Sequence, residues 1–270
     1  LKKQIIHPEI IKEVADELKI VYTPFHGTGN KPVRRILAEL GFKHVYVVPE
    51  QERPDPAFTT LDYPNPEDPK AFTLALKLAK KVDADIVLAT DPDADRLGIY
   101  AKDSKTGEYM PFTGNMSGML IAEYILRERT ATNRMPVDPV MVSTIVTTNM
   151  AAAIAADYNV ELREVLTGFK YIGEQIGLLE QAGEADRYIF GFEESYGYLS
   201  GAHVRDKDGV VASMLVCEMA AYYKEKGLSL LDVLNGLYRE HGVYRHSLVN
   251  AEFEGAQGMI AMQNLMDSLR

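Results

Sequence analysis

The sequence lacks tryptophan and holds a single cysteine, Cys217, among its 270 residues. One cysteine excludes an internal disulfide framework, and its apolar helical surroundings favour a buried thiol. Basic residues are also few, 29 against 39 acidic ones, and the net charge of -10 argues against a surface for nucleic acid or anionic membranes. No apolar run is long enough to cross a bilayer, and no segment has the pattern of a signal peptide. We therefore expect a cytoplasmic protein that binds neither nucleic acid nor membrane.

The remaining composition is that of a folded protein. An apolar content of 46% supports a sizeable core, and the length suits one large domain or two ordinary ones. The chain opens inside an amphipathic pattern that includes Ile5 and Ile10. We therefore expect it to be a piece of a longer chain.

Strand-like and helix-like patterns alternate along the sequence, which predicts an α/β fold with mixed, mostly parallel sheets. The predicted strands are 19–23, 45–48, 85–90, 97–101, 140–143, 161–165 and 188–192. The predicted helices are 32–40, 69–82, 115–129, 149–157, 171–182, 210–226 and 257–269, and the proline-rich segment 49–69 is a long loop. We interpret the chain as two tandem three-layer α/β domains, residues 1–108 and 109–245, with residues 246–270 as a linker and the start of another domain.

One acidic stretch is the most informative part of the sequence: Asp91, Asp93, Asp95 and Arg96 directly follow the predicted strand 85–90. Open α/β sheets bind ligands beyond the carboxyl ends of their strands. Three neighbouring carboxylates repel one another unless a cation compensates them, and oxygen ligands suit Mg²⁺ or Ca²⁺. A solvated turn is the commoner explanation, but the buried strand and the arginine favour a magnesium site that holds phosphoryl oxygens.

A calcium-binding EF-hand is a poorer fit to these aspartates. That loop requires glycine after the third aspartate and an acidic residue at its twelfth position. The sequence has Arg96 and Lys102 there. The pattern therefore argues against an EF-hand.

A second alternative is a dinucleotide-binding loop. Gly27 and Gly29 open a predicted helix, and Glu50 ends the next strand, which partly imitates that fingerprint. The third glycine position, however, is Pro32. We therefore favour a loop that faces phosphate or sugar over one that binds NAD.

Five motifs occur in a specific order: Thr-Pro-Phe-His-Gly-Thr-Gly (23–29), Thr-Asp-Pro-Asp-Ala-Asp-Arg (90–96), Thr-Gly-Phe-Lys (167–170), Gly-Phe-Glu-Glu-Ser-Tyr-Gly (191–197) and His-Val-Arg-Asp-Lys-Asp-Gly (203–209). Together they resemble the α-D-phosphohexomutases, the family of phosphoglucomutase and phosphomannomutase. Members of that family have four domains. The resemblance implies that this chain holds domains II and III and the entry to domain IV, so that domain I with its phosphoserine, and domain IV with its phosphate-binding loop, are missing.

The resemblance also implies ligand-binding roles. The aspartates at 91, 93 and 95 would hold Mg²⁺ together with a phosphoserine oxygen from the missing domain. Glu193 and Ser195 would bind two adjacent sugar hydroxyls, although an acidic pair can also be a solvated turn. Thr167 and Gly168 would sense which end of the sugar is presented.

Three further residues would take part in catalysis by the same resemblance. Arg96 would contact the transferred phosphoryl group, Lys207 would transfer a proton, and His26 would face the cleft. His26 can equally satisfy a loop carbonyl, and Lys207 lies in a charged stretch, 205–208, where a solvated run is a serious alternative.

The function implied is that of a magnesium-dependent phosphoglucomutase, which interconverts glucose 1-phosphate and glucose 6-phosphate. A phosphoserine enzyme and glucose 1,6-bisphosphate, as intermediate and activator, would carry the phosphoryl group. The Glu-Glu-Ser form of the motif at 191–197 favours glucose, with phosphomannomutase or a related phosphosugar mutase as the alternative. Because the phosphoserine domain is missing, we expect this piece to be inactive by itself.

Two other classes of function stay open. A haloacid-dehalogenase-like sugar phosphatase also places aspartates after an apolar strand and uses magnesium, with the first aspartate as nucleophile. Its motif has Thr or Val where this sequence has Asp95. The other alternative is a module that binds sugar phosphate without catalysis.

Overall fold

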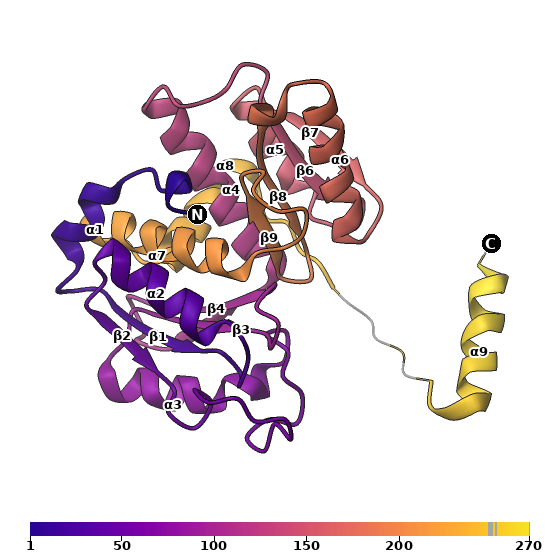
Figure 1. Cartoon of the computed structure of the whole chain (residues 1–270), viewed down its shortest axis with the longest axis horizontal. Helices are drawn as coiled ribbons and strands as arrows, with labels where there is room; N and C mark the ends of the chain where they lie inside the picture. Colours follow the sequence, from indigo (N-terminus) through magenta and orange to yellow (C-terminus); the bar gives the residue numbers. More distant parts are fainter. Residues whose placement is uncertain (248–250, 252, 270) are drawn as a thin grey trace.

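The computed structural model describes residues 1–247, 251 and 253–269, and within them the chain forms two α/β units, each built around one sheet (Figure 1). The strands are β1 (Lys19–Thr23), β2 (His44–Val47), β3 (Ile86–Thr90), β4 (Leu97–Lys102), β5 (Tyr109–Phe112), β6 (Val140–Thr144), β7 (Glu161–Val165), β8 (Tyr188–Glu193) and β9 (Gly197–Ser200). The α-helices are α1 (Pro8–Val14), α2 (Asn30–Leu40), α3 (Thr73–Val82), α4 (Gly114–Ala131), α5 (Met150–Asp157), α6 (Phe169–Gln181), α7 (Gly209–Glu225), α8 (Leu230–His241) and α9 (Gly255–Ser268). The short 3-10 helices are η1 (Lys2–Gln4), η2 (Pro69–Phe72) and η3 (Ala185–Arg187).

The first sheet has the order β2-β1-β3-β4-β5, with β2, β1 and β3 parallel and the last two strands antiparallel. Side chains on successive strand positions face opposite sides. Ile20 and Tyr22 therefore join the core beneath α1, α2 and α7, whereas Val21 and Val87 pack with α3 on the other side. This arrangement confirms the expected three layers for the first sheet.

The second sheet has the order β7-β6-β8-β9, with the first three strands parallel and β9 antiparallel to β8. Met141 and Phe192 face the core that contains α4 and α5, while Val142 and Leu199 pack against α6 on the opposite side. Both sheets are thus mixed and mostly parallel, as the sequence predicts.

The two sheets are closely joined through helix α7, which packs against α1 and α2 of the first half and against β9 of the second. One hydrophobic cluster includes Ile20 from the first sheet, Phe192 from the second and Leu215 from α7. Cys217 is buried in the same helix. The tandem units therefore share a core.

Several elements differ from the sequence-based predictions. Tyr109–Phe112 pairs with β4, so the first sheet continues past the predicted boundary at residue 108. Strand β9 and helix α8 were not predicted. Residues 69–82 form η2 followed by α3 instead of one α-helix, although Asp68 caps the start as expected by accepting a hydrogen bond from the Lys70 backbone N–H.

The C-terminal part stands apart from the sheets in Figure 1, as helix α9. This helix confirms the helical pattern predicted for 257–269, but residues 248–250 and 252 of the proposed linker, and residue 270, lie outside the described residues. Among the helices of the described residues, none is both long and apolar enough to span a membrane.

Candidate active site

The acidic loop (Asp91–Arg96) begins directly after β3, as expected from the sequence. One carboxylate oxygen from each of Asp91, Asp93 and Asp95 lies within 4.8 Å of the others. Asp91 is 2% exposed, whereas Asp93 is open to solvent. Burial, together with the charges of Asp95 and Asp93, raises the pKa of Asp91 to about 6, although hydrogen bonds from Arg96 act against this rise. The three side chains therefore form a concentrated negative charge.

Backbone contacts on both sides hold the acidic loop in place. The Thr28 N–H donates to the Pro92 carbonyl at 2.8 Å, and the Gly209 N–H donates to the Ala94 carbonyl at 3.0 Å. Ala94 adopts a left-handed conformation with φ of 63°. Such a conformation is costly for a residue other than glycine and persists where the surroundings enforce it. Backbone hydrogen bonds therefore hold the acidic loop against the start of α7 and against the segment that follows β1.

Arg96 is directed at the first aspartate of this loop. Its backbone N–H and its Nε donate to the two carboxylate oxygens of Asp91, each at 2.9 Å. Its Nη1 also reaches Glu67 at 3.3 Å, a residue of the proline-rich segment 49–69. The guanidinium group is thus fixed beside the carboxylates.

Lys207 brings the second half of the chain to the acidic loop. Its Nζ lies 2.8 Å from Oδ2 of Asp95 and 3.2 Å from Oδ1 of Asp206. The ammonium group also lies 5.8 Å from the centre of the Phe169 ring. A Cβ added to Gly197 would come within 2.3 Å of the Lys207 side chain, so that glycine makes room for it. Lys207 therefore touches three of the sequence motifs at once and is not in a solvated run.

The Glu-Glu-Ser loop (Glu193–Gly197) connects β8 to β9 and meets the acidic loop directly. The Leu97 N–H donates to the Tyr196 carbonyl at 3.0 Å, and Arg96 forms an isolated β-bridge with Gly197. Tyr196, like Ala94, is left-handed, with φ of 69°. Two residues with a left-handed backbone, Ala94 and Tyr196, therefore lie close to the contact between the acidic loop and the Glu-Glu-Ser loop.

Glu193 is 5% exposed, and its Oε1 accepts a hydrogen bond from the Gly168 N–H at 2.8 Å. Burial raises the pKa of this carboxyl group above its ordinary value. Gly168 has φ of 121°, a conformation that side chains rarely tolerate, which explains glycine at this position. The structure thus places Glu193 and Gly168 together, with Thr167 exposed beside them.

Glu194 anchors the other side of the same loop. Its Oε2 accepts hydrogen bonds from the hydroxyl groups of Thr144 at 3.1 Å and Thr147 at 3.3 Å. The loop backbone also presses on the first residue of α4, because a Cβ added to Gly114 would lie 1.9 Å from the Glu194 carbonyl oxygen. Ser195, the next residue of the loop, lines a cavity of about 840 Å³ that extends toward α8.

His26 lies in the loop after β1, but its ring faces the proline-rich segment. Its Nδ1 lies 2.8 Å from the Arg53 carbonyl oxygen and its Nε2 lies 2.7 Å from the Thr60 hydroxyl. The side chain is buried, and both ring nitrogens have partners. These contacts give His26 a structural role, and its part in catalysis stays a prediction.

The glycines of the dinucleotide-like pattern also have a packing role. A Cβ added to Gly27 would lie 2.4 Å from Pro92, and one added to Gly29 would lie 2.5 Å from the Thr90 hydroxyl oxygen. Both glycines therefore let the loop after β1 approach the acidic loop. This close packing leaves no space against the two glycines for a pyrophosphate group.

Several residues of the site were not singled out from the sequence. Glu67 and Asn65, which contact Arg96, come from an irregular segment without a recognisable pattern. Gly114 contacts the Glu194 backbone, and the Glu194 carboxylate is anchored by Thr144 and Thr147 at and after the end of β6, so both depend on residues far away in the sequence. Near Gly114 the sequence offers Thr113, a residue type that commonly caps the start of a helix, and its side chain does so here.

The fold and the site together define a class of protein, in which two joined α/β units bring a carboxylate cluster, a lysine and a Glu-Glu-Ser loop to one junction. The family pattern described as "Phosphoglucomutase/phosphomannomutase, alpha/beta/alpha domain II" matches residues 3–106, and that for domain III of the same family matches residues 113–241. The chain belongs to the phosphoglucomutase/phosphomannomutase family.

The chain is similar to phosphoglucomutases of staphylococci. It is 39% identical over 254 residues to that of Staphylococcus epidermidis, a match that covers 94% of this chain and 45% of the relative. It is 37% identical over 254 residues to that of Staphylococcus aureus, with the same coverage of 94% and 45%. The chain therefore spans about half the length of these curated relatives.

A solved structure with the same fold is the phosphoglucomutase parafusin from Paramecium. It is 20% identical, with a TM-score of 0.65, over 90% of this chain and 40% of that one. A phosphoglucomutase/phosphomannomutase family protein from Burkholderia thailandensis is 21% identical, with a TM-score of 0.63, over 86% of this chain and 46% of that one. These likenesses support the fold of the chain.

Proposed function

We propose that the chain supplies domains II and III of a magnesium-dependent phosphoglucomutase, which interconverts glucose 1-phosphate and glucose 6-phosphate. One observation carries the proposal: the acidic loop and the Glu-Glu-Ser loop meet at the β-bridge between Arg96 and Gly197, and Lys207 contacts both. A phosphoryl group held at the first loop would thus face a sugar held at the second. Domain I of the family would supply the phosphoserine, and domain IV would bind the other phosphate of the substrate.

The residues of the acidic loop fit a magnesium ion. All three donors are carboxylates, which hard divalent cations prefer, and their oxygens lie within 4.8 Å of one another. A bound Mg²⁺ would polarise the phosphoryl oxygens and neutralise part of their charge. Arg96, fixed by Asp91, would bind the same group from the side with its guanidinium N–H donors.

The second half of the chain would bind and orient the sugar. The carboxylate of Glu193 can accept hydrogen bonds from sugar hydroxyls, and the hydroxyl of Ser195 can donate or accept one. Lys207 would deliver a proton to the sugar oxygen, because its ammonium group, paired with Asp95, lies where the two loops meet. Thr167 and Gly168 would sense which end of the sugar is presented, and His26 would support the loop beside the acidic loop.

Glucose 1,6-bisphosphate is the proposed intermediate and activator. One fold neighbour, the N-acetylphosphoglucosamine mutase of Aspergillus fumigatus, was solved in complex with glucose 1,6-bisphosphate (TM-score 0.52, 16% identical). The names of the staphylococcal relatives favour glucose as the sugar, with mannose or another phosphosugar as the alternative. We also propose a cytoplasmic location, because Cys217 is a free, buried thiol and proteins without disulfides are typical of reducing compartments.

The phosphatase alternative needs Asp91, the first aspartate, as a nucleophile. Asp91 is 2% exposed, and both of its oxygens accept hydrogen bonds from Arg96. A carboxylate held in this way is poorly placed to attack a phosphoryl group. The geometry therefore favours transfer to a sugar over an aspartyl-phosphate mechanism.

The test is a mutase assay of the full-length protein that contains this chain, with Mg²⁺ and a trace of glucose 1,6-bisphosphate. Conversion of glucose 1-phosphate to the 6-phosphate, measured beside mannose 1-phosphate, establishes the reaction and the sugar. Release of free phosphate without isomerisation would instead indicate a phosphatase. Binding of the sugar phosphate without either product would leave a non-catalytic module.

A further inference from the structure

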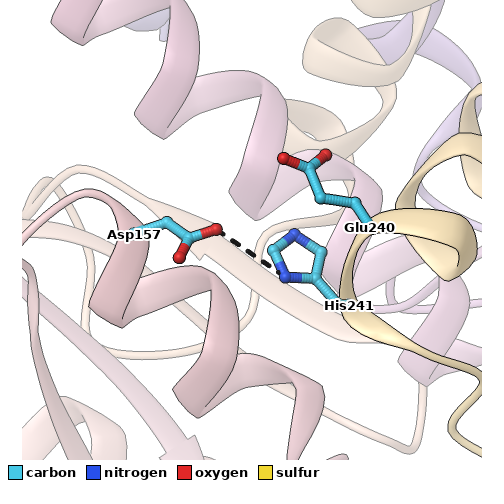
Figure 2. A group of neighbouring side chains, drawn as sticks. All are labelled: Asp157, Glu240 and His241. Atoms are coloured by element: carbon cyan, nitrogen blue, oxygen red, sulfur yellow. Dashed lines mark ion pairs between the residues drawn. The ribbon is translucent and has the colours of Figure 1, made fainter.

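Outside the candidate active site, three side chains with metal-binding atoms meet where two helices end. Asp157 is the last residue of α5, and Glu240 and His241 are the last two residues of α8. One donor atom from each lies within 4.8 Å of the others. Figure 2 shows the two carboxylates on different sides of the His241 ring, each arriving from its own helix. We call these three residues the helix-end cluster.

The imidazole of His241 is the least ordinary member of the cluster. Its side chain is only 9% exposed, and its Nδ1 lies 3.7 Å from Oδ2 of Asp157, too far for a hydrogen bond. Within residues 1–247, 251 and 253–269 no residue forms a hydrogen bond with this ring. Neither ring nitrogen is among the fully buried polar atoms without a partner in the described residues, and His241 as a whole is only partly buried, so the ring nitrogens remain accessible. An accessible imidazole nitrogen without a hydrogen-bond partner among the described residues can serve as a ligand to a cation.

The electrostatic surroundings favour a cation at the same place. The C-terminal end of a helix carries a partial negative charge, and α5 ends on Asp157 without a basic residue in its last turn. Glu240 adds a second carboxylate, and the buried Glu123 lies close enough for Glu240 to contribute to raising its pKa, after the larger effect of burial. Arg127 pairs with Glu123 at 3.1 Å, and the last turn of α8 also carries Arg239 beside Glu240.

We propose that Asp157, Glu240 and His241 bind a divalent transition-metal ion of the Zn²⁺ type. One imidazole and two carboxylates suit this class of ion, whereas the acidic loop offers carboxylates alone and suits Mg²⁺. In a tetrahedral zinc site neighbouring ligand atoms lie roughly 3.4 Å apart. The 3.7 Å between Asp157 and His241 is close to this value, and the Asp157 side chain, 54% exposed, is free to adjust.

The ion would join the end of α5 to the end of α8. The chain that follows α8 reaches the cavity of about 840 Å³, which Val243 and Ser247 help to line together with Ser195. The helix-end cluster would therefore fix the start of a segment that borders the Glu-Glu-Ser loop. Its binding of metal does not depend on the proposed mutase activity.

The test is calorimetric titration of the chain with ZnCl₂, followed by Co²⁺ absorption spectra, in the presence of excess Mg²⁺. We expect one Zn²⁺ site, whose affinity falls at least about tenfold in His241→Ala and in Asp157→Asn. Two matched controls should keep the site: His246→Ala changes another histidine, exposed on the surface, and Asp93→Asn changes the acidic loop.

A second measurement protects the test against misfolding of a variant. Zn²⁺ should raise the unfolding temperature of the unaltered chain and of His246→Ala. In Glu240→Gln, a change at an exposed side chain, Zn²⁺ should raise the unfolding temperature hardly at all. Zinc affinity in His241→Ala and Asp157→Asn equal to that of the unaltered chain would overturn the proposal. Absence of any Zn²⁺ binding by the unaltered chain would overturn it as well.

Discussion

Lys207 and Asp95 form an ion pair that joins the two halves of the candidate site, with 2.8 Å between Nζ and Oδ2. The lysine precedes α7, and the aspartate belongs to the acidic loop after β3. Both side chains are largely shielded, with 18% and 25% exposure. Lys207 therefore neutralises part of the negative charge of the acidic loop. A divalent cation bound at this loop would compete with Lys207 for the Asp95 carboxylate.

The first prediction tests this competition. Lys207→Met should bind Mn²⁺, a spectroscopic substitute for Mg²⁺, roughly tenfold more tightly, because a positive charge leaves the vicinity of the ion. Turnover by the full-length protein should fall, since the same ammonium group is proposed to move the proton. Electron paramagnetic resonance of free Mn²⁺ measures the affinity. Lys12→Met, at an exposed lysine, is the control, and weaker Mn²⁺ binding by Lys207→Met would contradict the idea.

The second prediction concerns the exposed member of the acidic loop. Asp93→Ala should weaken Mn²⁺ binding by at least about tenfold, because it removes one of three carboxylate ligands. In the full-length protein it should abolish Mg²⁺-dependent mutase activity. Asp186→Ala changes an exposed aspartate far from the loop in sequence and should alter neither quantity. Full activity in Asp93→Ala would exclude it as a metal ligand.

Much of the fold could be predicted because its signals are local. The run before Asp91 is apolar at four successive positions, 86–89, and the strand that it forms with Thr90 is buried throughout. Gly41 ends α2 in a left-handed conformation with φ of 102°, as a glycine after a helix predicts. The order of the five motifs predicted the family, which the comparisons confirm.

The features that could not be predicted depend on contacts between distant residues. Strand β9 has four residues, and its pairing with β8 is what defines it. Helix α8 does have a local signal, a capping box between Ser229 and Asp232. The ring of His26 could not be placed from the sequence, because its two partners come from the irregular segment 49–69.

The third prediction compares two glycines in helices. Gly114→Ala should destabilise the protein by about 1 to 3 kcal/mol and displace the Glu-Glu-Ser loop, because its Cβ would lie 1.9 Å from the Glu194 carbonyl oxygen. Gly177→Ala in α6 meets nothing within 4 Å and should stabilise the protein by about 0.5 to 1 kcal/mol. Urea unfolding measures both changes. Equal effects of the two substitutions would show that the loop does not press on α4.

The fourth prediction concerns a buried acid between the halves of the chain. Glu218 in α7 is fully buried, and its Oε1 accepts hydrogen bonds from the backbone N–H groups of Ile6 at 2.7 Å and His7 at 2.5 Å. Its Oε2 accepts no hydrogen bond of good geometry from the described residues, although the Tyr124 hydroxyl lies near enough to lower the Glu218 pKa in part. Burial raises the pKa of Glu218 above its ordinary value of 4.5, although the two backbone hydrogen bonds lower it in part.

This raised pKa fixes how stability depends on pH. As the pH rises above about 4.5, the unfolded chain releases the Glu218 proton before the folded chain does, so the free energy of unfolding falls until the folded group has also titrated. Glu218→Gln keeps an oxygen for Ile6 and His7 but cannot ionise. Its free energy of unfolding should exceed that of the unaltered protein at pH 7 to 8, and the difference should shrink toward about pH 4.5. Urea titrations across this range measure it, with Glu225→Gln, at an exposed position of the same helix, as the control. A difference that does not change with pH would mean that the group titrates alike in both states.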